Sequence, residues 1–461
     1  MTPPRPPRPP RRVRPARRIR PPRRLRALAA AAAVTALLLA GCSPGAPSDR
    51  ANPGGQVRIR FQSLAWQKES VEANKALVAE WNTAHPGIRV EYVQGSWSSV
   101  HDQLLTSFEG GEAPDVIHDA SDDLADFAYA GHLADLRPLL SDRLTSDIPA
   151  RSWESTTLGA DGGVYGVPFL QEPRVLMANT ALLRASGVRV PTPESPWSWE
   201  EFRTAARSLT TDGRYGIAWP LKDPVSATLN LGLSAGGRLF HREPDGRAAI
   251  RWAEGDSVVP ATIRAQLDTD RSASRATLGM GGADILPGFF GGKYAMVPLG
   301  FSYRQQIVRQ APPGFEWQVL PPPAGPAGPA QGVSPQTLSV ARSSRHPQEA
   351  AAFIEFLLSP PHMVRLARGD WMLPTGTEAL ADPALRTPEL GWATGAALAE
   401  RLSPAPAPSV RGYPEWKDKV ATPALQEYYS GAIGLGELEE RLVRDGNRVL
   451  ARYQRQPPGR K

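Results

Sequence analysis

Short apolar stretches of two kinds alternate along the chain after residue 55. Hydrophobic residues at every second position over 56–61 predict a strand. Residues 67–85 carry Val71, Leu77, Val78 and Trp81 on one helical face, which predicts a helix that ends at Pro86. The same criteria predict strands at 88–93, 115–118 and 164–169, the last one interrupted by a proline, and helices at 100–109 and 124–130. Strands that alternate with helices favour an α/β layer with a parallel sheet.

A second α/β pattern begins at residue 175. It predicts strands at 175–179, 215–219 and 294–298 and helices at 180–186, 199–209, 226–234 and up to 290. The Pro- and Gly-rich residues 321–332 fit neither a helix nor a central strand, so we expect a crossing between domains there. A strand at 337–341, a helix at 347–358, a Pro/Ala-rich stretch at 402–409 and helices at 417–429 and 435–453 follow.

The charge of the chain is concentrated at its start. The full sequence has 53 Lys+Arg and 46 Asp+Glu, a net charge of +7, and 11 arginines with no acid lie in the first 26 residues. The remaining residues therefore carry 7 − 11 = −4. The basic total invites a nucleic-acid interpretation, but that interpretation disappears once the leader is set aside.

The leader and the single cysteine indicate export. Basic residues precede an apolar stretch at 27–40 that is too short to span a bilayer, as in a signal peptide. Leu39-Ala40-Gly41-Cys42 resembles a bacterial lipobox, in which the cysteine thiol receives diacylglycerol; a buried structural cysteine is the alternative. We expect a signal peptide at 1–41, a lipidated flexible tether at 42–55 and attachment to the outer face of the cell membrane.

Two features of the leader remain open. Arg17-Arg18 and Arg23-Arg24 would allow a twin-arginine route in place of general secretion, and translation could begin near Val13. The few lysines among many Arg, Pro and Ala residues point to a GC-rich, actinobacterial genome.

Nine short stretches in order resemble the extracellular solute-binding proteins of ABC importers, in particular the sugar-binding family that includes maltose-binding protein. The first is 81–90, which contains Trp81-Asn82 and His85-Pro86-Gly87, and the second is Gly110-Gly111-Glu112-Ala113-Pro114-Asp115-Val116; the others are 130–136, 165–169, 177–183, 199–202, 235–240, 290–296 and 344–351. The resemblance implies a two-lobed α/β fold of the periplasmic-binding-protein type (type II), with three hinge crossings and a ligand cleft between the lobes. By analogy, lobe 1 is 56–168 plus 331–381 and lobe 2 is 169–330 plus 382–455.

The resemblance also implies where a ligand would bind. A sugar needs carboxylate, amide and guanidinium partners for its hydroxyls and aromatic rings for its C–H faces, on loops that follow the strands. We expect ligand contacts from Trp66, Gln67, Trp97, Asp119, Ser121, Asp122, Glu172, Trp219, Phe301, Tyr303, Trp371, Arg411 and Tyr413.

Each candidate has a plainer interpretation. A tryptophan is more often packed in a core, which we expect for Trp81, Trp199 and Trp416. Asp119 and Asp122 could cap the following helix, and Arg411 could be a surface charge. The chain also departs from the family pattern: Met177-Ala178 stands where two tyrosines are common, and Phe301-Ser302-Tyr303 where a tryptophan is common. These departures leave the ligand open.

The predicted function is therefore capture of a carbohydrate, an oligosaccharide in particular, for an ABC importer. The alternatives are a polyamine, a polyol phosphate or a peptide as the ligand, or a secreted hydrolase. Gly232-Leu233-Ser234-Ala235-Gly236 matches a nucleophile elbow, but a helical pattern precedes the serine where a strand is required. Asp119, Asp122 and Asp123 could serve glycoside cleavage. The seven histidines include no His-x-x-x-His pair, so we expect no metal. The resemblance implies a binding protein that is not an enzyme, needs no cofactor, and works as a monomer with a membrane permease.

Overall fold

The computed structural model describes residues 55–159, 162–243, 247–405 and 409–455. The predicted signal peptide and Cys42 lie outside these residues. Across the described part of the chain, no helix combines the length and the apolar character needed to cross a membrane.

Lobe 1 is built on a six-stranded sheet with the order β15-β6-β14-β3-β1-β2. Its strands are β1 (Val57–Ser63), β2 (Ile88–Gln94), β3 (Val116–Ala120), β6 (Val167–Gln171), β14 (Gln336–Val340) and β15 (Leu373–Pro374). β1 runs parallel to β2 and β3, whereas β14 is antiparallel to β3 and β6. The ends of β1, β2, β3 and β6 therefore lie at the same edge of the sheet as the start of β14.

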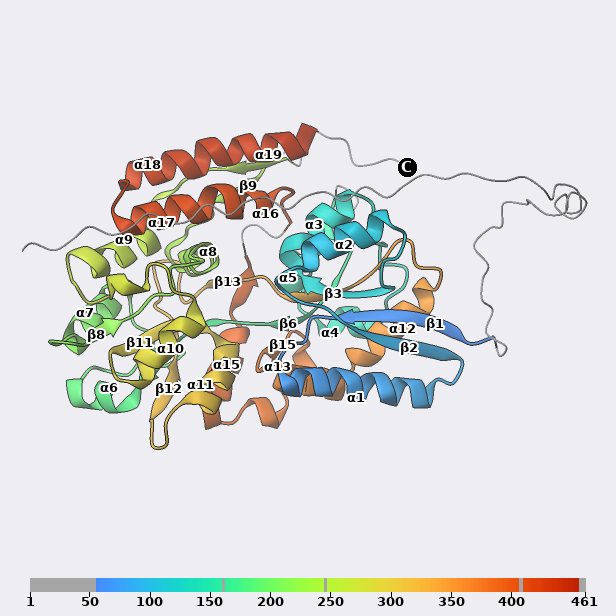
Figure 1. The fold of residues 1–461 in the computed structure, drawn as a ribbon, viewed down its shortest axis with the longest axis horizontal. Helices are drawn as coiled ribbons and strands as arrows, with labels where there is room; N and C mark the ends of the chain where they lie inside the picture. The colour runs from blue at the N-terminus through green and yellow to red at the C-terminus, as the bar shows by residue number, and fades with distance from the viewer. Residues whose placement is uncertain (1–54, 160–161, 244–246, 406–408, 456–461) are drawn as a thin grey trace, which may run out of the picture. The chain divides into compact units, whose positions relative to one another are not determined.

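Helices cover both faces of this sheet (Figure 1). Leu77 and Trp81 of the first helix pack with Ile59 and Phe61 in the core on one face. Leu124 belongs to a second core cluster on the opposite face. The helices of lobe 1 are α1 (Lys68–Ala84), α2 (Val100–Glu109), α3 (Ser121–Tyr129), α4 (Asp142–Asp147), α5 (Ala150–Trp153), α12 (Pro347–Leu357), α13 (Pro360–Asp370) and α14 (Thr377–Leu380), with a small hairpin of β4 (Thr157–Leu158) and β5 (Gly163–Val164).

Lobe 2 is built on a four-stranded sheet with the order β12-β7-β11-β8. Its strands are β7 (Arg174–Asn179), β8 (Tyr215–Ile217), β11 (Tyr294–Gly300) and β12 (Trp317–Leu320), and β9 (Phe240–Arg242) pairs separately with β10 (Ala248–Ile250). Its helices are α6 (Thr180–Ser186), α7 (Trp199–Leu209), α8 (Val225–Gly232), α9 (Glu254–Asp268), α10 (Gly282–Phe290) and α11 (Arg304–Gln310).

The C-terminal part adds α15 (Trp392–Ala399), α16 (Tyr413–Trp416), α17 (Thr422–Ser430), α18 (Leu435–Glu440) and α19 (Gly446–Arg455). Short π-helical turns at Lys417–Ala421 and Arg441–Asp445 join α16 to α17 and α18 to α19. These helices contribute Trp416, Tyr429 and Leu438 to the same core as Trp199 and Phe202, so they complete lobe 2.

Two of the connections between the lobes are joined to each other by a hydrogen bond. The first runs from β6 to β7 through Glu172, and the second runs from β13 (Gln331–Val333) to β14. The side chain of Gln331 is buried and its Oε1 accepts a hydrogen bond of 2.8 Å from the backbone N–H of Arg174. β13 also pairs in parallel with β16 (Leu402–Pro404), so the returning C-terminal segment joins the same set of connections.

Most of the predicted elements are present, and the local end signals work as expected. Ser198 and Glu201 form a capping box at the start of α7, and Gly187 ends α6 with a positive φ of 66°. Trp81, Trp199 and Trp416 are buried, as predicted.

The strand predicted at 164–169 is wrong in its limits. Residues 163–164 belong to the β4–β5 hairpin, and β6 begins at Val167 and continues to Gln171. The break contains Gly166, where a Cβ atom would lie 3.0 Å from the Ser339 Oγ atom, so close approach of β14 requires a glycine there. Because β6 stays in the lobe-1 sheet to Gln171, the first crossing lies beyond the expected boundary at residue 168.

Candidate functional site

Six of the expected ligand residues follow the strands that end at one edge of the lobe-1 sheet. Parallel pairing of β1 with β2 and β3 puts the loops after these strands side by side. The six are Trp66 and Gln67 after β1, Trp97 after β2, and Asp119, Ser121 and Asp122 at the junction of β3 and α3. The sequence predicted this group because all three strands point the same way.

The aromatic and amide side chains of the loop after β1 differ in exposure. Trp66 is 58% exposed, which is high for a tryptophan and leaves its ring open to a solute. Gln67 is buried, and its Oε1 has no hydrogen-bond partner among the described residues. Trp97 is half-buried and meets His118 edge to face at 5.6 Å between ring centres.

The junction of β3 and α3 presents unsatisfied polar atoms. Asp119 Oδ1 accepts a hydrogen bond of 2.8 Å from the Ala120 N–H. Asp119 Oδ2, Ser121 Oγ and Asp122 Oδ1 are buried and lack a partner within the described structure. α3 has Ala120 at its N-cap position and no side-chain capping bond, so the capping alternative for Asp119 and Asp122 is wrong. Unpaired buried polar atoms are costly, which is typical of a site that awaits a partner.

Burial also governs the charge of these carboxyl groups. Burial raises the pKa of Asp119 well above its ordinary value, and the nearby carboxylate of Asp123 raises it further. Burial raises the pKa of Asp122 too, although the Ser334 hydroxyl and Lys417 act in the opposite direction. His101 binds Asp123 at 3.1 Å, and this contact raises the pKa of the imidazole.

Glu172 and Tyr303 lie where the first crossing meets β11. Glu172 Oε1 accepts a hydrogen bond of 2.8 Å from the Ser302 N–H, and its carboxylate lies against Gly300, where a Cβ atom would come within 2.4 Å. Tyr303 is half-buried, and burial together with the charge of Glu172 raises the pKa of its phenol. Glu172 thus lies just past the first crossing, where the sequence placed it, and the structure adds that the start of the segment with Tyr303 is hydrogen-bonded to it.

Three other expected residues pack in cores, which corrects the sequence interpretation. Trp219 is 1% exposed and donates from Nε1 to Gln266 Oε1 at 2.7 Å inside lobe 2. Phe301 is fully buried against Trp392. Tyr413 is buried against Phe240 and Trp416. Their rings are occupied by protein neighbours, so they do not present open faces to a solute.

Arg411 and Trp371 take part in contacts between the lobes. The guanidinium of Arg411 lies 5.1 Å from the centre of the Tyr129 ring in α3, and the next residue, Gly412, donates its N–H to Asp126 Oδ1 at 3.0 Å. Trp371 ends α13 with a positive φ of 56° and stacks on Trp392, with 6.2 Å between ring centres. The plain surface-charge interpretation of Arg411 is therefore wrong.

Arg304 is a feature that sequence analysis missed. Its guanidinium is fully buried and donates to the carbonyl oxygens of Phe301 at 2.7 Å, Leu390 at 2.8 Å and Trp371 at 3.0 Å. It lies 3.3 Å from the centre of the Phe301 ring and 4.0 Å from that of the Trp392 ring. One arginine among many in the sequence gives no signal of such burial.

The nucleophile-elbow argument for a hydrolase does not hold in the structure. Ser234 is 1% exposed, donates to the Leu231 carbonyl at 2.8 Å and accepts from Trp199 Nε1 at 3.0 Å. Helix α8 precedes it, as the sequence predicted, so its hydroxyl is engaged in local structure. Within the described ranges, no group of three or more His, Cys, Asp and Glu side chains is arranged to hold a metal ion.

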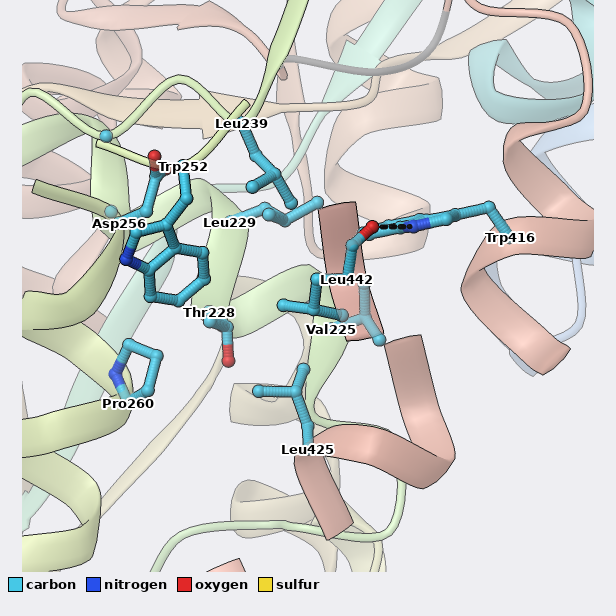
Figure 2. Close-up of a pocket in the computed structure, with 12 residues that line it drawn as sticks. Val225, Thr228, Leu229, Leu239, Trp252, Asp256, Pro260, Trp416, Leu425 and Leu442 are labelled. Carbon is cyan, nitrogen blue, oxygen red and sulfur yellow. Dashed lines mark hydrogen bonds between the residues drawn. The ribbon is translucent and has the colours of Figure 1, made fainter. Parts of the chain in front are cut away.

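Lobe 2 contains a small internal pocket of about 20 Å³ (Figure 2). Figure 2 shows Trp252, Pro260 and Leu425 around it, and Trp416 donating from Nε1 to the Leu442 carbonyl at 3.3 Å. This volume holds a water molecule or two and no solute. This pocket is therefore too small to be the site of a solute.

Comparison with known proteins decides the family. Residues 65–364 match the family of bacterial extracellular solute-binding proteins. The chain belongs to this family. It is also 69% identical over 409 residues to an uncharacterised lipoprotein from the oleD 5′ region of Streptomyces antibioticus, a match that covers 88% of this chain and 89% of the relative.

Solved structures of this family's fold agree with the architecture. The sugar-binding protein MalE from Xanthomonas citri superposes with a TM-score of 0.75 at 23% identity, covering 86% of this chain and 98% of that one. The cyclic α-maltosyl-1,6-maltose binding protein from Arthrobacter globiformis gives a TM-score of 0.74 at 18% identity, covering 86% and 100%. The fold is thus the predicted two-lobed α/β fold of maltose-binding-protein-like binding proteins.

Proposed function

We propose that this solute-binding protein captures a carbohydrate, an oligosaccharide in particular, between its lobes and delivers it to an ABC permease in the membrane. The observation that carries the proposal is the pairing of the exposed Trp66 ring with the unsatisfied polar atoms of Gln67, Asp119, Ser121 and Asp122 at one sheet edge. A pyranose offers both an apolar C–H face for the ring and hydroxyls for those acceptors.

The structural relatives support the same ligand class. One of them is named as a sugar-binding protein and the other as a binding protein for cyclic α-maltosyl-1,6-maltose. At identities of 23% and 18% these relatives share the fold with this chain, so the proposed contacts are taken from the residues of this chain. We propose contacts from lobe 1 by Trp66, Gln67, Trp97, Asp119, Ser121, Asp122 and Trp371, from the first crossing by Glu172, and from lobe 2 by Tyr303 and Arg411.

We also propose that Cys42 carries a lipid anchor and that the protein works as an exported monomer on the outer face of the cell membrane. The relative from Streptomyces antibioticus is described as a lipoprotein and is 69% identical, which supports the lipobox interpretation. In this role the 14 residues at 42–55 act as a tether between the membrane and the first strand.

The decisive experiment is a binding screen with product analysis. The purified protein is heated with single mono- and oligosaccharides, and a ligand that binds the folded state alone raises the melting temperature. Calorimetry on each hit then gives affinity, and chromatography of the sugar after incubation reports any cleavage. We expect saturable binding with the sugar recovered intact. Release of a cleavage product, or binding of no carbohydrate, would refute the proposal.

A cationic solute is the second candidate, favoured by one observation. Asp119, Asp122, Asp123 and Asp126 all lie at or in α3, and a polyamine would be attracted to this set of carboxyl groups. The same screen decides between the two candidates when spermidine and putrescine are included. A melting-temperature rise with the amines alone would support the cationic ligand.

A further inference from the structure

His118 lies behind the lobe-1 edge, and the proposed ligand contacts do not include it. It is the third residue of β3 and is 2% exposed. Asp119 follows it directly, so the residue sits between the sheet and the polar junction described above. Its ring makes defined contacts with several separate segments of lobe 1.

Hydrogen bonds fix the protonation of the His118 ring. The Leu64 backbone N–H donates to Nδ1 at 3.0 Å, so Nδ1 must carry a lone pair. The proton of the neutral ring is then on Nε2, which lies 2.8 Å from Gln336 Oε1 and donates to it. A second proton on the ring would remove the acceptor that holds the Leu64 N–H. Burial lowers the pKa of His118 to about 4, which agrees with a neutral ring.

The contacts of His118 reach three segments that carry proposed ligand contacts. Leu64 begins the loop that presents Trp66. The ring of Trp97 meets the imidazole edge to face. Gln336 links the imidazole to the third segment, because its Nε2 lies 3.2 Å from the sulfur of Met372, the residue after Trp371. The Phe169 ring also meets the imidazole edge to face, with 5.0 Å between the ring centres.

We propose that His118 is the positioning residue of the lobe-1 half of the ligand site. Its Nδ1 lone pair holds the loop after β1 so that Trp66 stands at a fixed place beside Trp97 and the junction of β3 and α3. This inference rests on the proposed carbohydrate function for its effect on affinity. Its effect on the loop itself is independent of any ligand. Gln94 supports the same loop from β2 by donating to the Ala65 carbonyl at 2.7 Å, so loss of His118 loosens the loop without removing it from the sheet.

Two substitutions separate the hydrogen bond from the packing of the ring. His118→Asn places an amide oxygen near the position of Nδ1 and can still accept from Leu64. His118→Gln places its amide nitrogen near Nε2 and keeps a donor for Gln336, but it offers Leu64 no acceptor at the Nδ1 position. Both variants lose the aromatic ring, so each is the matched control for the other.

Two measurements are made on wild type and both variants. Hydrogen exchange with mass spectrometry follows the Leu64 amide in the peptide that covers the loop, with a β7 peptide of lobe 2 as a check on the fold. Calorimetry measures affinity for the best oligosaccharide from the screen. We expect His118→Gln to speed exchange at Leu64 and weaken binding about tenfold, as loss of one hydrogen bond allows. We expect His118→Asn to stay within about threefold of wild type in both measurements.

Contrary outcomes are distinguishable. If both variants exchange at the wild-type rate, or if both lose affinity equally, the Nδ1 hydrogen bond does not position the loop and the inference is overturned. If wild type binds no oligosaccharide, the proposed function fails and the exchange measurement alone decides the positioning role. If His118→Gln does not fold, Gln336→Leu replaces it: without its acceptor at Nε2 the ring can change tautomer, and Leu64 exchange should again rise.

Discussion

The Nη2 atom of Arg304 in lobe 2 donates a hydrogen bond of 3.0 Å to the carbonyl oxygen of Trp371 in lobe 1. The arginine thus binds the C-cap residue of α13, which has left-handed backbone geometry. The same guanidinium also binds the Leu390 carbonyl, in the segment that returns to lobe 2. A buried charge at this place gives the connection between the lobes a defined geometry.

Replacing Arg304 by methionine should destabilise the protein. The apolar side chain fills similar space but leaves three buried carbonyl oxygens without their donors. We expect the free energy of unfolding to fall by about 2–4 kcal/mol. Urea unfolding followed by circular dichroism measures the loss. Arg342→Met, at an exposed position of lobe 1, is the matched control and should change stability by less than about 0.5 kcal/mol. An equal effect of the two substitutions would contradict the role given to Arg304.

Truncation of Trp66 or Arg411 should weaken ligand binding. Trp66→Ala removes the exposed ring of the lobe-1 edge, and Arg411→Ala removes the guanidinium that the facing segment presents above Tyr129. We expect each to cost about 1–3 kcal/mol of binding free energy, measured by calorimetry. Trp252→Ala, in the internal pocket of lobe 2, is the control and should leave affinity unchanged. Unaltered affinity in both site variants would refute the placement of the site.

Asp370 should make stability depend on pH. This carboxyl is 4% exposed, and burial raises its pKa from 3.8 to about 6, although the Ser70 hydroxyl acts in the opposite direction. The folded state therefore binds the proton more tightly than the unfolded state. The resulting stabilisation is complete below about pH 4 and is lost as the pH rises through about 6.

Asp370→Asn removes this titration. Relative to wild type, we expect the variant to gain stability as the pH is raised, by about 2–3 kcal/mol at most above pH 7. Urea unfolding across pH 5 to 8 measures the difference between the two proteins. Asp142→Asn, at an exposed carboxylate, is the control, and its free energy of unfolding should change with pH in the same way as that of wild type. A constant difference between Asp370→Asn and wild type over this range would contradict the expectation.

The ion pair of Glu69 and Arg309 should limit movement between the lobes. Arg309 Nη2 lies 2.5 and 2.6 Å from the two oxygens of Glu69, and buried Gln305 donates to the same carboxylate at 2.8 Å. Glu69→Gln should widen the distribution of distances between spin labels on Arg342 of lobe 1 and Val190 of lobe 2. Because the pair is half exposed, stability should fall by no more than about 1 kcal/mol.

Glu80 offers a matched control on the same helix. Its carboxylate binds Arg365 at 2.8 and 2.9 Å, but both residues belong to lobe 1. Glu80→Gln should therefore leave the distance distribution between the lobes unchanged. A widening of equal size in both variants would show that the Glu69 contact has no special effect on the lobes.

Cys42 should determine where the exported protein is found. Cys42→Ala removes the thiol that accepts the lipid, so we expect the protein to leave the membrane fraction and to lose the mass of the diacylglycerol group. Fractionation and mass spectrometry of the protein expressed in a streptomycete host measure both effects. Cys42→Ala protein that remains on the membrane would contradict lipidation at this residue.

Sequence analysis located most strands and helices because their signals are local. The alternation over β1, the helical face of Leu77 and Trp81, and the capping box at Ser198 each involve residues within a few turns of one another. The loops after β1, β2 and β3 could also be grouped in advance, since parallel strands place their carboxyl ends together. Limits that depend on a distant partner could not be predicted in this way, as at Gly166, where β14 approaches the chain.

The identity of the exposed ring could not be obtained in this way. Trp66 and Trp219 both follow a strand, yet one is 58% exposed and the other 1%. Trp219 is covered by Phe202 and by Gln266, which is 47 positions away. Burial depends on which segments pack over a side chain, and hydrophobic patterning along the chain does not contain that information.

The sequence by itself determined the α/β character, the order of the elements and the likeness to solute-binding proteins, because periodicity, end signals and short motifs are properties of neighbouring residues. Tertiary structure alone decided that Arg304 joins the lobes, that His118 accepts a hydrogen bond from the loop of Trp66, and that Asp119, Ser121 and Asp122 have buried oxygens without a partner among the described residues. These features depend on hydrogen bonds between residues far apart in the chain, and such partners meet only when the chain is folded.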